Sequence, residues 1–126
     1  MKRLLFIDDE SQLLAIFRKA FTKEHYEVFT ATSGLEGLKI ARKEKPDLIV
    51  LDMRMPKLDG LEVLKRLRKR DKKTKVVMLT GYGTAGLIRE ALELGISDFV
   101  AKPFDLHALQ RLIKEVLNSV SGQGTT

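Results

Sequence analysis

Residues 48–56 have the sequence LIVLDMRMP. Four apolar residues at 48–51 are followed by Asp52, and Pro56 ends the stretch. A short apolar run that stops at turn-forming residues is typical of a strand buried on both faces of a sheet. Because such a strand needs helices on both sides, this stretch predicts an α/β fold.

The rest of the chain repeats this pattern. Short apolar runs at 4–7, 26–31, 48–51, 76–79 and 99–100 alternate with longer stretches whose apolar residues have helical spacing. Ser33, Asp59 and Asp105 stand where helix N-caps are expected. Strict alternation with right-handed crossovers predicts a (βα)5 fold: a doubly wound, flavodoxin-like parallel sheet of five strands in the order 2-1-3-4-5.

The fourth helical stretch is one example. Its spacing puts Leu87, Ile88, Ala91 and Leu92 on one face. Gly95 follows, where a left-handed residue commonly ends a helix.

Composition favours one domain. The chain has 126 residues and no Cys, which excludes disulfides and thiolate metal sites. We expect a domain over residues 1–118 and a flexible tail or linker start at 119–126. No apolar run reaches the roughly 18 residues of a membrane span, and the first residues lack the apolar region of a signal peptide. A cytoplasmic protein without membrane contact is therefore expected.

The formal net charge is +6, and much of the excess lies at residues 65–75 (KRLRKRDKKTK). Two interpretations are open. The segment is a solvated helix end, where cations favour the C-terminal dipole, or it binds an acidic partner such as nucleic acid. The first is preferred, since no aromatic residues are interleaved for stacking on bases.

Polar residues follow four of the expected strands. Asp8 and Asp9 come after the first strand, Asp52 after the third, Thr80 after the fourth and Lys102 after the fifth. Ligands of open α/β sheets bind outside the carboxyl ends of the strands, so these side chains are expected to meet. Each has an ordinary alternative role, as a helix cap, a turn residue or a strand exit. The complementary set together favours a functional site.

This set has the chemistry of phosphoryl transfer. Three close carboxylates repel one another, and Mg²⁺ prefers such oxygen ligands. One Mg²⁺ and Lys102 would make the site formally neutral. Asp52 can act as a nucleophile to give an acyl phosphate. The Lys102 ammonium and the Thr80 hydroxyl can then stabilise the phosphoryl oxygens.

From about residue 3 to residue 117 the chain resembles the receiver domain of two-component response regulators. The resemblance rests on FIDDE at 6–10, LDMRMP at 51–56, Asp59-Gly60, Thr80-Gly81 and FVAKPF at 99–104. It implies a signalling domain, not an enzyme, in which a histidine kinase or a phosphotransfer protein phosphorylates Asp52. Asp8, Asp9, Asp52 and the backbone carbonyl of Arg54 would bind Mg²⁺.

The resemblance also implies a switch. Thr80 would hydrogen-bond the phosphoryl group, Lys102 would pair with it, and Phe99 would move inward. The Lys102–Pro103 peptide bond would be cis, which is readily accessible before proline. Phosphorylation-dependent homodimers would form through the fourth helix, fifth strand and fifth helix, and the domain itself would not bind nucleic acid.

Three residues modify what the resemblance to the family implies. Phe99 stands where Tyr is common, so the switch would work by packing alone. Arg54 and Tyr82 lie two residues beyond Asp52 and Thr80, at positions that flank the path of the hydrolytic water in the family. Because both are bulky, slow autodephosphorylation is expected.

A small Mg²⁺-dependent phosphatase-like enzyme is the alternative from another class. Such enzymes also place an Asp at a strand end, with Thr or Ser and Lys, on a doubly wound sheet. They need an acid two residues after the nucleophile, where this chain has Arg54. The length of 126 residues also leaves no room for a cap domain.

Overall fold

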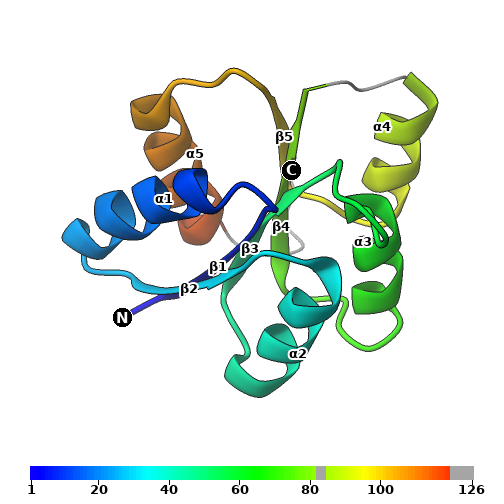
Figure 1. Cartoon of the computed structure of the whole chain (residues 1–126), viewed down its shortest axis with the longest axis horizontal. Coiled ribbons are helices and arrows are strands. Elements are labelled where there is room, and N and C mark those ends of the chain that lie inside the picture. The colour runs from blue at the N-terminus through cyan, green and yellow to red at the C-terminus, as the bar shows by residue number, and fades with distance from the viewer. Residues whose placement is uncertain (82–84, 120–126) are drawn as a thin grey trace.

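Five strands and five helices alternate over residues 1–81 and 85–119, which the computed structural model describes (Figure 1). The strands are β1 (Arg3–Ile7), β2 (Glu27–Ala31), β3 (Leu48–Asp52), β4 (Lys75–Thr80) and β5 (Asp98–Ala101). The helices are α1 (Ser11–Lys23), α2 (Gly34–Glu44), α3 (Gly60–Arg68), α4 (Ala85–Glu93) and α5 (Leu106–Asn118).

All strand pairs are parallel, and the strand order is β2-β1-β3-β4-β5. The predicted flavodoxin-like fold is confirmed. Helices α1 and α5 cover one face of the sheet, and α2, α3 and α4 cover the other (Figure 1). Alternate strand residues enter the two cores: Leu4 and Phe6 face α1 and α5, whereas Leu5 and Ile7 face the other layer. Burial on both faces explains why the strands are continuously apolar.

The predicted N-caps are confirmed. The side chains of Ser33 and Asp59 each accept a hydrogen bond from the backbone N–H three residues further on, and Asp105 accepts two. These bonds satisfy amide groups that have no partner within their own helices. Gly95 has φ +88°, the left-handed conformation expected just after α4.

Helix α4 packs through a narrower stripe than its apolar spacing predicted. Ala91 is fully buried, but Leu87 is 37% exposed and Leu92 is 51% exposed. The apolar face of this helix is therefore only partly buried. The helix covers the edge of the sheet beside β5, so only a small part of its surface has sheet beneath it.

Arg68 corrects the preferred interpretation of the basic segment. This side chain, near the middle of residues 65–75, is only 7% exposed. Its guanidinium donates to the carbonyl oxygens of Leu94, Asp71, Thr74 and Gly95 at 2.8–2.9 Å. The expected solvated helix end is thus wrong for Arg68, which joins the end of α3 to the end of α4.

Within residues 1–81 and 85–119, no helix is both long enough and apolar enough to cross a membrane. Most of the expected tail, at 120–126, lies outside the described residues. The boundary at residue 118 and the cytoplasmic location stay predictions.

Candidate functional site

Strand register brings the acidic side chains together. Ile7 of β1 is paired with Leu51 of β3, so the residues that follow them, Asp8 and Asp52, lie level on neighbouring strands. Asp9 is the next residue along. One carboxylate oxygen from each of these three residues lies within 4.8 Å of the others. The acids predicted from the strand ends therefore form one cluster.

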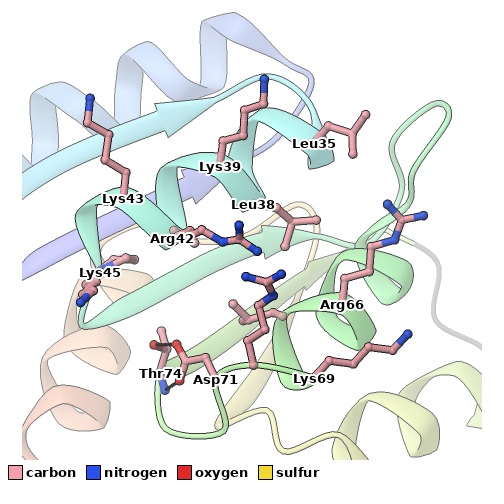
Figure 2. A pocket seen from close by; sticks show the side chains of 14 residues that line it. Leu35, Leu38, Lys39, Arg42, Lys43, Lys45, Arg66, Lys69, Asp71 and Thr74 are labelled. Carbon is pink, nitrogen blue, oxygen red and sulfur yellow. Dashed lines mark hydrogen bonds between the residues drawn. The ribbon is translucent and has the colours of Figure 1, made fainter.

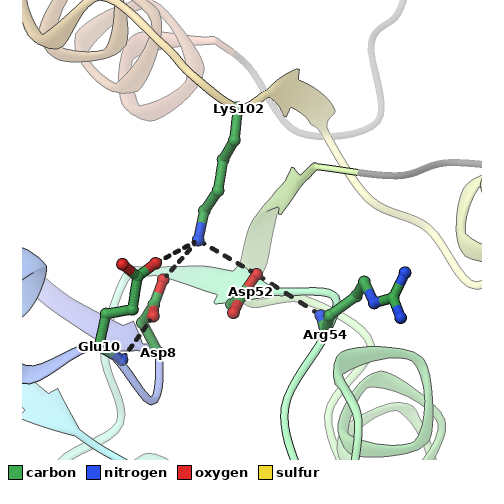
Figure 3. Close-up of polar contacts among 5 residues, drawn as sticks. All are labelled: Asp8, Glu10, Asp52, Arg54 and Lys102. Atoms are coloured by element: carbon green, nitrogen blue, oxygen red, sulfur yellow. Dashed lines mark hydrogen bonds and ion pairs between the residues drawn. The ribbon is translucent and has the colours of Figure 1, made fainter.

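Lys102 supplies the positive charge at this cluster. It follows β5, and its Nζ lies 3.1 Å from Oδ2 of Asp8 and 3.4 Å from Oδ1 of Asp52 (Figure 3). A third contact, 3.3 Å to Oε1 of Glu10, was not predicted. The sequence feature that could have indicated this contact is that Glu10 stands only two residues after Asp8. The ammonium thus bridges carboxylates from two strand ends.

The carboxyl group of Asp52 is electrostatically unusual. The residue is 4% exposed. Burial, followed by repulsion from Asp8, raises its pKa to about 6, although Lys102 and the backbone N–H of Arg54 oppose the shift. At Lys102, burial favours the neutral amine, but the hydrogen bond to Asp8 and the charge of Asp52 outweigh it and raise the pKa. The site therefore holds excess negative charge that Lys102 only partly balances.

The acidic cluster is consistent with a metal site. Its donors are carboxylate oxygens, which Mg²⁺ prefers. A divalent cation would relieve the repulsion between Asp8 and Asp52, which is the second cause, after burial, of the raised pKa of Asp52. Neither Asp8 nor Asp9 is the N-cap residue of α1, because that position is taken by Glu10, whose side chain makes no capping hydrogen bond.

Thr80 and Phe99 differ sharply in their surroundings. Thr80 is 5% exposed, and its Oγ1 has no hydrogen-bond partner among the described residues. A buried hydroxyl without a partner is costly, so a ligand oxygen at this place would satisfy it. Phe99, on β5, is 38% exposed. The peptide bond between Lys102 and Pro103 is cis.

The residues expected to slow hydrolysis are described only in part. Arg54 is exposed, and its guanidinium points away from Asp52 and Lys102 (Figure 3). Its backbone N–H lies 3.5 Å from Oδ1 of Asp52. Tyr82, the second of these residues, lies outside the described part of the chain.

Comparison with known proteins agrees with this geometry. Residues 4–114 match the family described as "Response regulator receiver domain". The chain is a response regulator receiver domain. It is accordingly a module of two-component and phosphorelay signalling, not an enzyme acting on other substrates.

Relatives of the receiver domain include proteins of quite different length. Over 116 residues it is 39% identical to sporulation initiation phosphotransferase F of Bacillus subtilis, covering 92% of this chain and 94% of that protein. It is 40% identical to the alkaline phosphatase synthesis transcriptional regulatory protein PhoP of the same organism, covering 92% of this chain. There the match covers only 48% of the relative, so the chain spans about half the length of that regulator.

Solved structures resemble the receiver domain over nearly its whole length. A CheY-like receiver domain from Methanospirillum hungatei has a TM-score of 0.90 and 30% identity, covering 94% of both chains. A CheX-CheY-BeF3-Mg+2 complex from Borrelia burgdorferi has a TM-score of 0.86 and 26% identity, covering 94% of this chain and 90% of that one. That second structure contains Mg²⁺, in line with the acidic cluster described above.

Proposed function

We propose that Asp52 accepts a phosphoryl group from a histidine kinase or a phosphotransfer protein and that the domain thereby switches its output surface. One observation carries the proposal: the Lys102 ammonium lies between the carboxylates of Asp8 and Asp52, at the same sheet edge as the buried Thr80 hydroxyl, which has no partner among the described residues. Membership of the family supports the same assignment.

Asp8, Asp9, Asp52 and the backbone carbonyl of Arg54 are the residues that would hold Mg²⁺. When bound, Mg²⁺ neutralises the carboxylates and the charge on the phosphoryl oxygens. Support comes from the three carboxylate oxygens within 4.8 Å of one another. Asp8 is held in place as well, since its Oδ1 accepts a hydrogen bond from the Glu10 N–H at 2.9 Å.

In the transfer, a carboxylate oxygen of Asp52 forms a bond to phosphorus while the P–N bond of the donor's phosphohistidine breaks and the imidazole leaves. A pKa of about 6 leaves Asp52 mostly ionised at neutral pH, as a nucleophile requires. Lys102 then exchanges its carboxylate contacts for a phosphoryl oxygen. Thr80 donates its hydroxyl proton to another, which gives that group a partner that it does not have among the described residues.

The output follows from the movement of Thr80. As Thr80 is drawn to the phosphate, it leaves space beside β5 into which the exposed ring of Phe99 turns. Nearby, Leu87 and Leu92 of α4 are also exposed, so this side of the domain offers apolar surface for a homodimer through α4, β5 and α5. Glu90 already pairs with Lys65 at 3.1 Å, so it is not a free partner for a second subunit.

The lifetime of the acyl phosphate is a separate part of the proposal. Arg54 and Tyr82 are bulky, and in the family the side chains at these two positions flank the path of the hydrolytic water. The guanidinium of Arg54 has to turn from its present direction to cover Asp52 (Figure 3). Replacing both residues by Ala should shorten the half-life of the phosphorylated protein, and an unchanged half-life would contradict this part.

Incubation with acetyl phosphate and Mg²⁺, followed by intact-protein mass spectrometry, tests the phosphorylation itself. We expect one added phosphoryl group on the wild type and none on Asp52→Asn. Asp47→Asn is the matched control, because Asp47 is exposed and immediately precedes β3, at the far end from Asp52. Phosphorylation of Asp52→Asn would refute the assignment. Repeated turnover of a phosphomonoester would favour the phosphatase-like alternative.

Size measurement with and without beryllofluoride tests the output surface. A shift from monomer to dimer that Leu92→Glu prevents would support the α4-β5-α5 interface. An unchanged size would refute homodimerisation as the output.

A further inference from the structure

A groove of about 1070 Å³ lies between α2 and α3 (Figure 2). Its lining includes Lys45 and Pro46, which precede β3, and Thr74, which precedes β4. These residues stand at the amino ends of the strands, whereas Asp52 and Lys102 stand at the carboxyl ends. The groove is therefore a different surface from the phosphoryl site.

The groove is strongly basic. Half of its 14 lining residues are Lys or Arg. They come from two segments far apart in the sequence: residues 39–45, on α2 and at its end, and residues 66–70, at the end of α3 and just beyond it. Leu38 and Arg42 point from α2 towards α3, while Lys39 and Lys43 project from the outer side of α2 (Figure 2). The fold thus joins the basic segment recognised in the sequence to a second one on α2.

Counter-charges for these cations are scarce within the chain. Among the described residues, Arg42 and Arg70 form no ion pair. Arg66 pairs with Glu62, with 3.2 Å between Nε and Oε2. The one acid in the described lining is Asp71. Its carboxylate is already engaged by the Thr74 hydroxyl and by the backbone N–H groups of Lys73 and Thr74. Within the described part of the chain, several cations are therefore held near one another with few compensating acids, and an anionic ligand would relieve their repulsion.

The floor of the groove is apolar. Leu38 and Ala41 of α2 and Leu67 of α3 line it, and Leu67 is only 8% exposed. Leu35, at the start of α2, is 58% exposed and extends the apolar surface to one end of the groove. A simple inorganic anion would leave this apolar floor in contact with water. The combination fits a ligand with both acidic and apolar groups.

The groove is elongated along α2. Leu35, Leu38, Arg42 and Lys45 recur three or four residues apart, so they run along one side of the whole helix. Helix α2 has 11 residues, which corresponds to about 16 Å, or three helical turns. An elongated occupant matches this shape better than a compact one.

We propose that the α2-α3 groove docks an acidic amphipathic helix of a partner protein, about three turns long. Its apolar residues, spaced three or four apart, contact the leucines of the floor. Its Asp and Glu side chains pair with Arg42, Arg66 and Arg70 on the rim. This is the helix-in-groove mode of recognition, with charge complementarity setting the orientation. The surface is independent of Asp52, so docking does not require phosphorylation.

A display selection with random peptides tests the proposal directly. A library of random 16-residue peptides is selected on the full chain, and the binders are measured by fluorescence anisotropy on three variants. Arg42→Glu/Arg70→Glu replaces two cations of the groove by acids. Lys19→Glu/Lys114→Glu makes the same charge change on α1 and α5, and Leu35→Asn alters only an exposed leucine. Enriched peptides should carry acids and apolar residues at helical spacing. Their affinity should fall at least tenfold on the groove variant, fall measurably on Leu35→Asn, and stay unchanged on the control.

The same measurements can overturn the proposal. Peptides that lose affinity equally on the groove variant and the control respond to net charge alone. Enriched acidic peptides without apolar periodicity, or no enrichment at all, contradict an amphipathic helix. A single-stranded RNA oligonucleotide that binds more tightly than any peptide and depends on Arg42 and Arg70 would assign the groove to nucleic acid instead.

Discussion

Gly60, the first residue of α3, lies directly against the backbone of Asp52. A Cβ atom on Gly60 would overlap the carbonyl oxygen of Asp52 and would lie 2.7 Å from Cα of Met53. The Gly60 N–H also donates to the Met53 carbonyl at 2.9 Å. The start of α3 and the end of β3 are therefore held together by a contact that only glycine permits.

We expect Gly60→Ala to lower the free energy of unfolding by about 2 kcal/mol, because backbone must move to admit the methyl group. The moving backbone belongs to Asp52, so phosphorylation by acetyl phosphate should slow as well. Urea unfolding and the rate of mass increase measure the two effects.

Gly86→Ala is the matched control. Gly86 lies in α4, and a Cβ there would meet nothing within 4 Å. Because alanine favours helix over glycine, this change should stabilise the domain by up to about 1 kcal/mol. If both variants gained stability, the close approach at Gly60 would be refuted.

Asp52→Asn should stabilise the domain at neutral pH in the absence of divalent cations. The pKa of Asp52 is raised from 3.8 to about 6, so the folded state binds more protons than the unfolded state between these values. Stability of the wild type therefore falls as pH rises from about 4 to about 6 and stays reduced above that. Asparagine has no charge to bury, although it loses the pairing with Lys102. We expect a gain of about 2 kcal/mol at pH 7.5 that shrinks towards zero near pH 4.

Urea unfolding of both proteins at the two pH values measures this difference. Added Mg²⁺ should stabilise the wild type more than the variant, because the variant lacks one of the three carboxylates of the cluster. A gap that did not change with pH would show that burial of the Asp52 charge is not its cause.

The gathering of the candidate site residues at one sheet edge could be predicted from the sequence because it follows from topology. Asp8, Asp52, Thr80 and Lys102 stand at the ends of apolar runs, and parallel strands bring such ends to one edge. Neither the register nor any side-chain conformation had to be known. The same reasoning missed Glu10, because its contact with Lys102 depends on how two flexible side chains are directed.

The features that could not be predicted depend on packing between distant segments. Arg68 stands among several Lys and Arg residues, and nothing local distinguishes it from them. It is buried because the ends of α3 and α4 meet and leave carbonyl groups around it. Likewise, the exposure of Leu87 and Leu92 reflects the place of α4 at the sheet edge. Helical spacing identifies a common face but not what covers it.

Arg68→Met should cost about 3 kcal/mol of unfolding free energy, since it leaves buried carbonyl groups without donors. Arg68→Lys should retain only part of this free energy, because one ammonium cannot reach all four carbonyl groups. Arg66→Met is the control: Arg66 is exposed, and its bond to Glu62 one turn away is worth about 0.5 kcal/mol at most. Amide hydrogen exchange at residues 94–97 should quicken in Arg68→Met alone. Equal losses for the two methionine variants would contradict a special role for Arg68.

Thr80→Val should separate stability from switching. Valine has nearly the shape of threonine and removes a hydroxyl that is buried without a hydrogen-bond partner among the described residues. The free energy of unfolding should therefore rise by about 1 kcal/mol. Thr30→Val, where the hydroxyl accepts a bond from Arg18 at 2.9 Å, should bring no such gain. If Thr80 carries the signal, Thr80→Val should still bind beryllofluoride and Mg²⁺, but the NMR signals of the Phe99 ring should no longer shift on binding. Thr80→Ser keeps a hydroxyl and should retain the shift. A Phe99 response that survived in Thr80→Val would mean that the effect of the bound phosphoryl group is transmitted to β5 without the Thr80 hydroxyl. Lys102, which directly follows β5, would then be the residue that links the phosphoryl group to this strand.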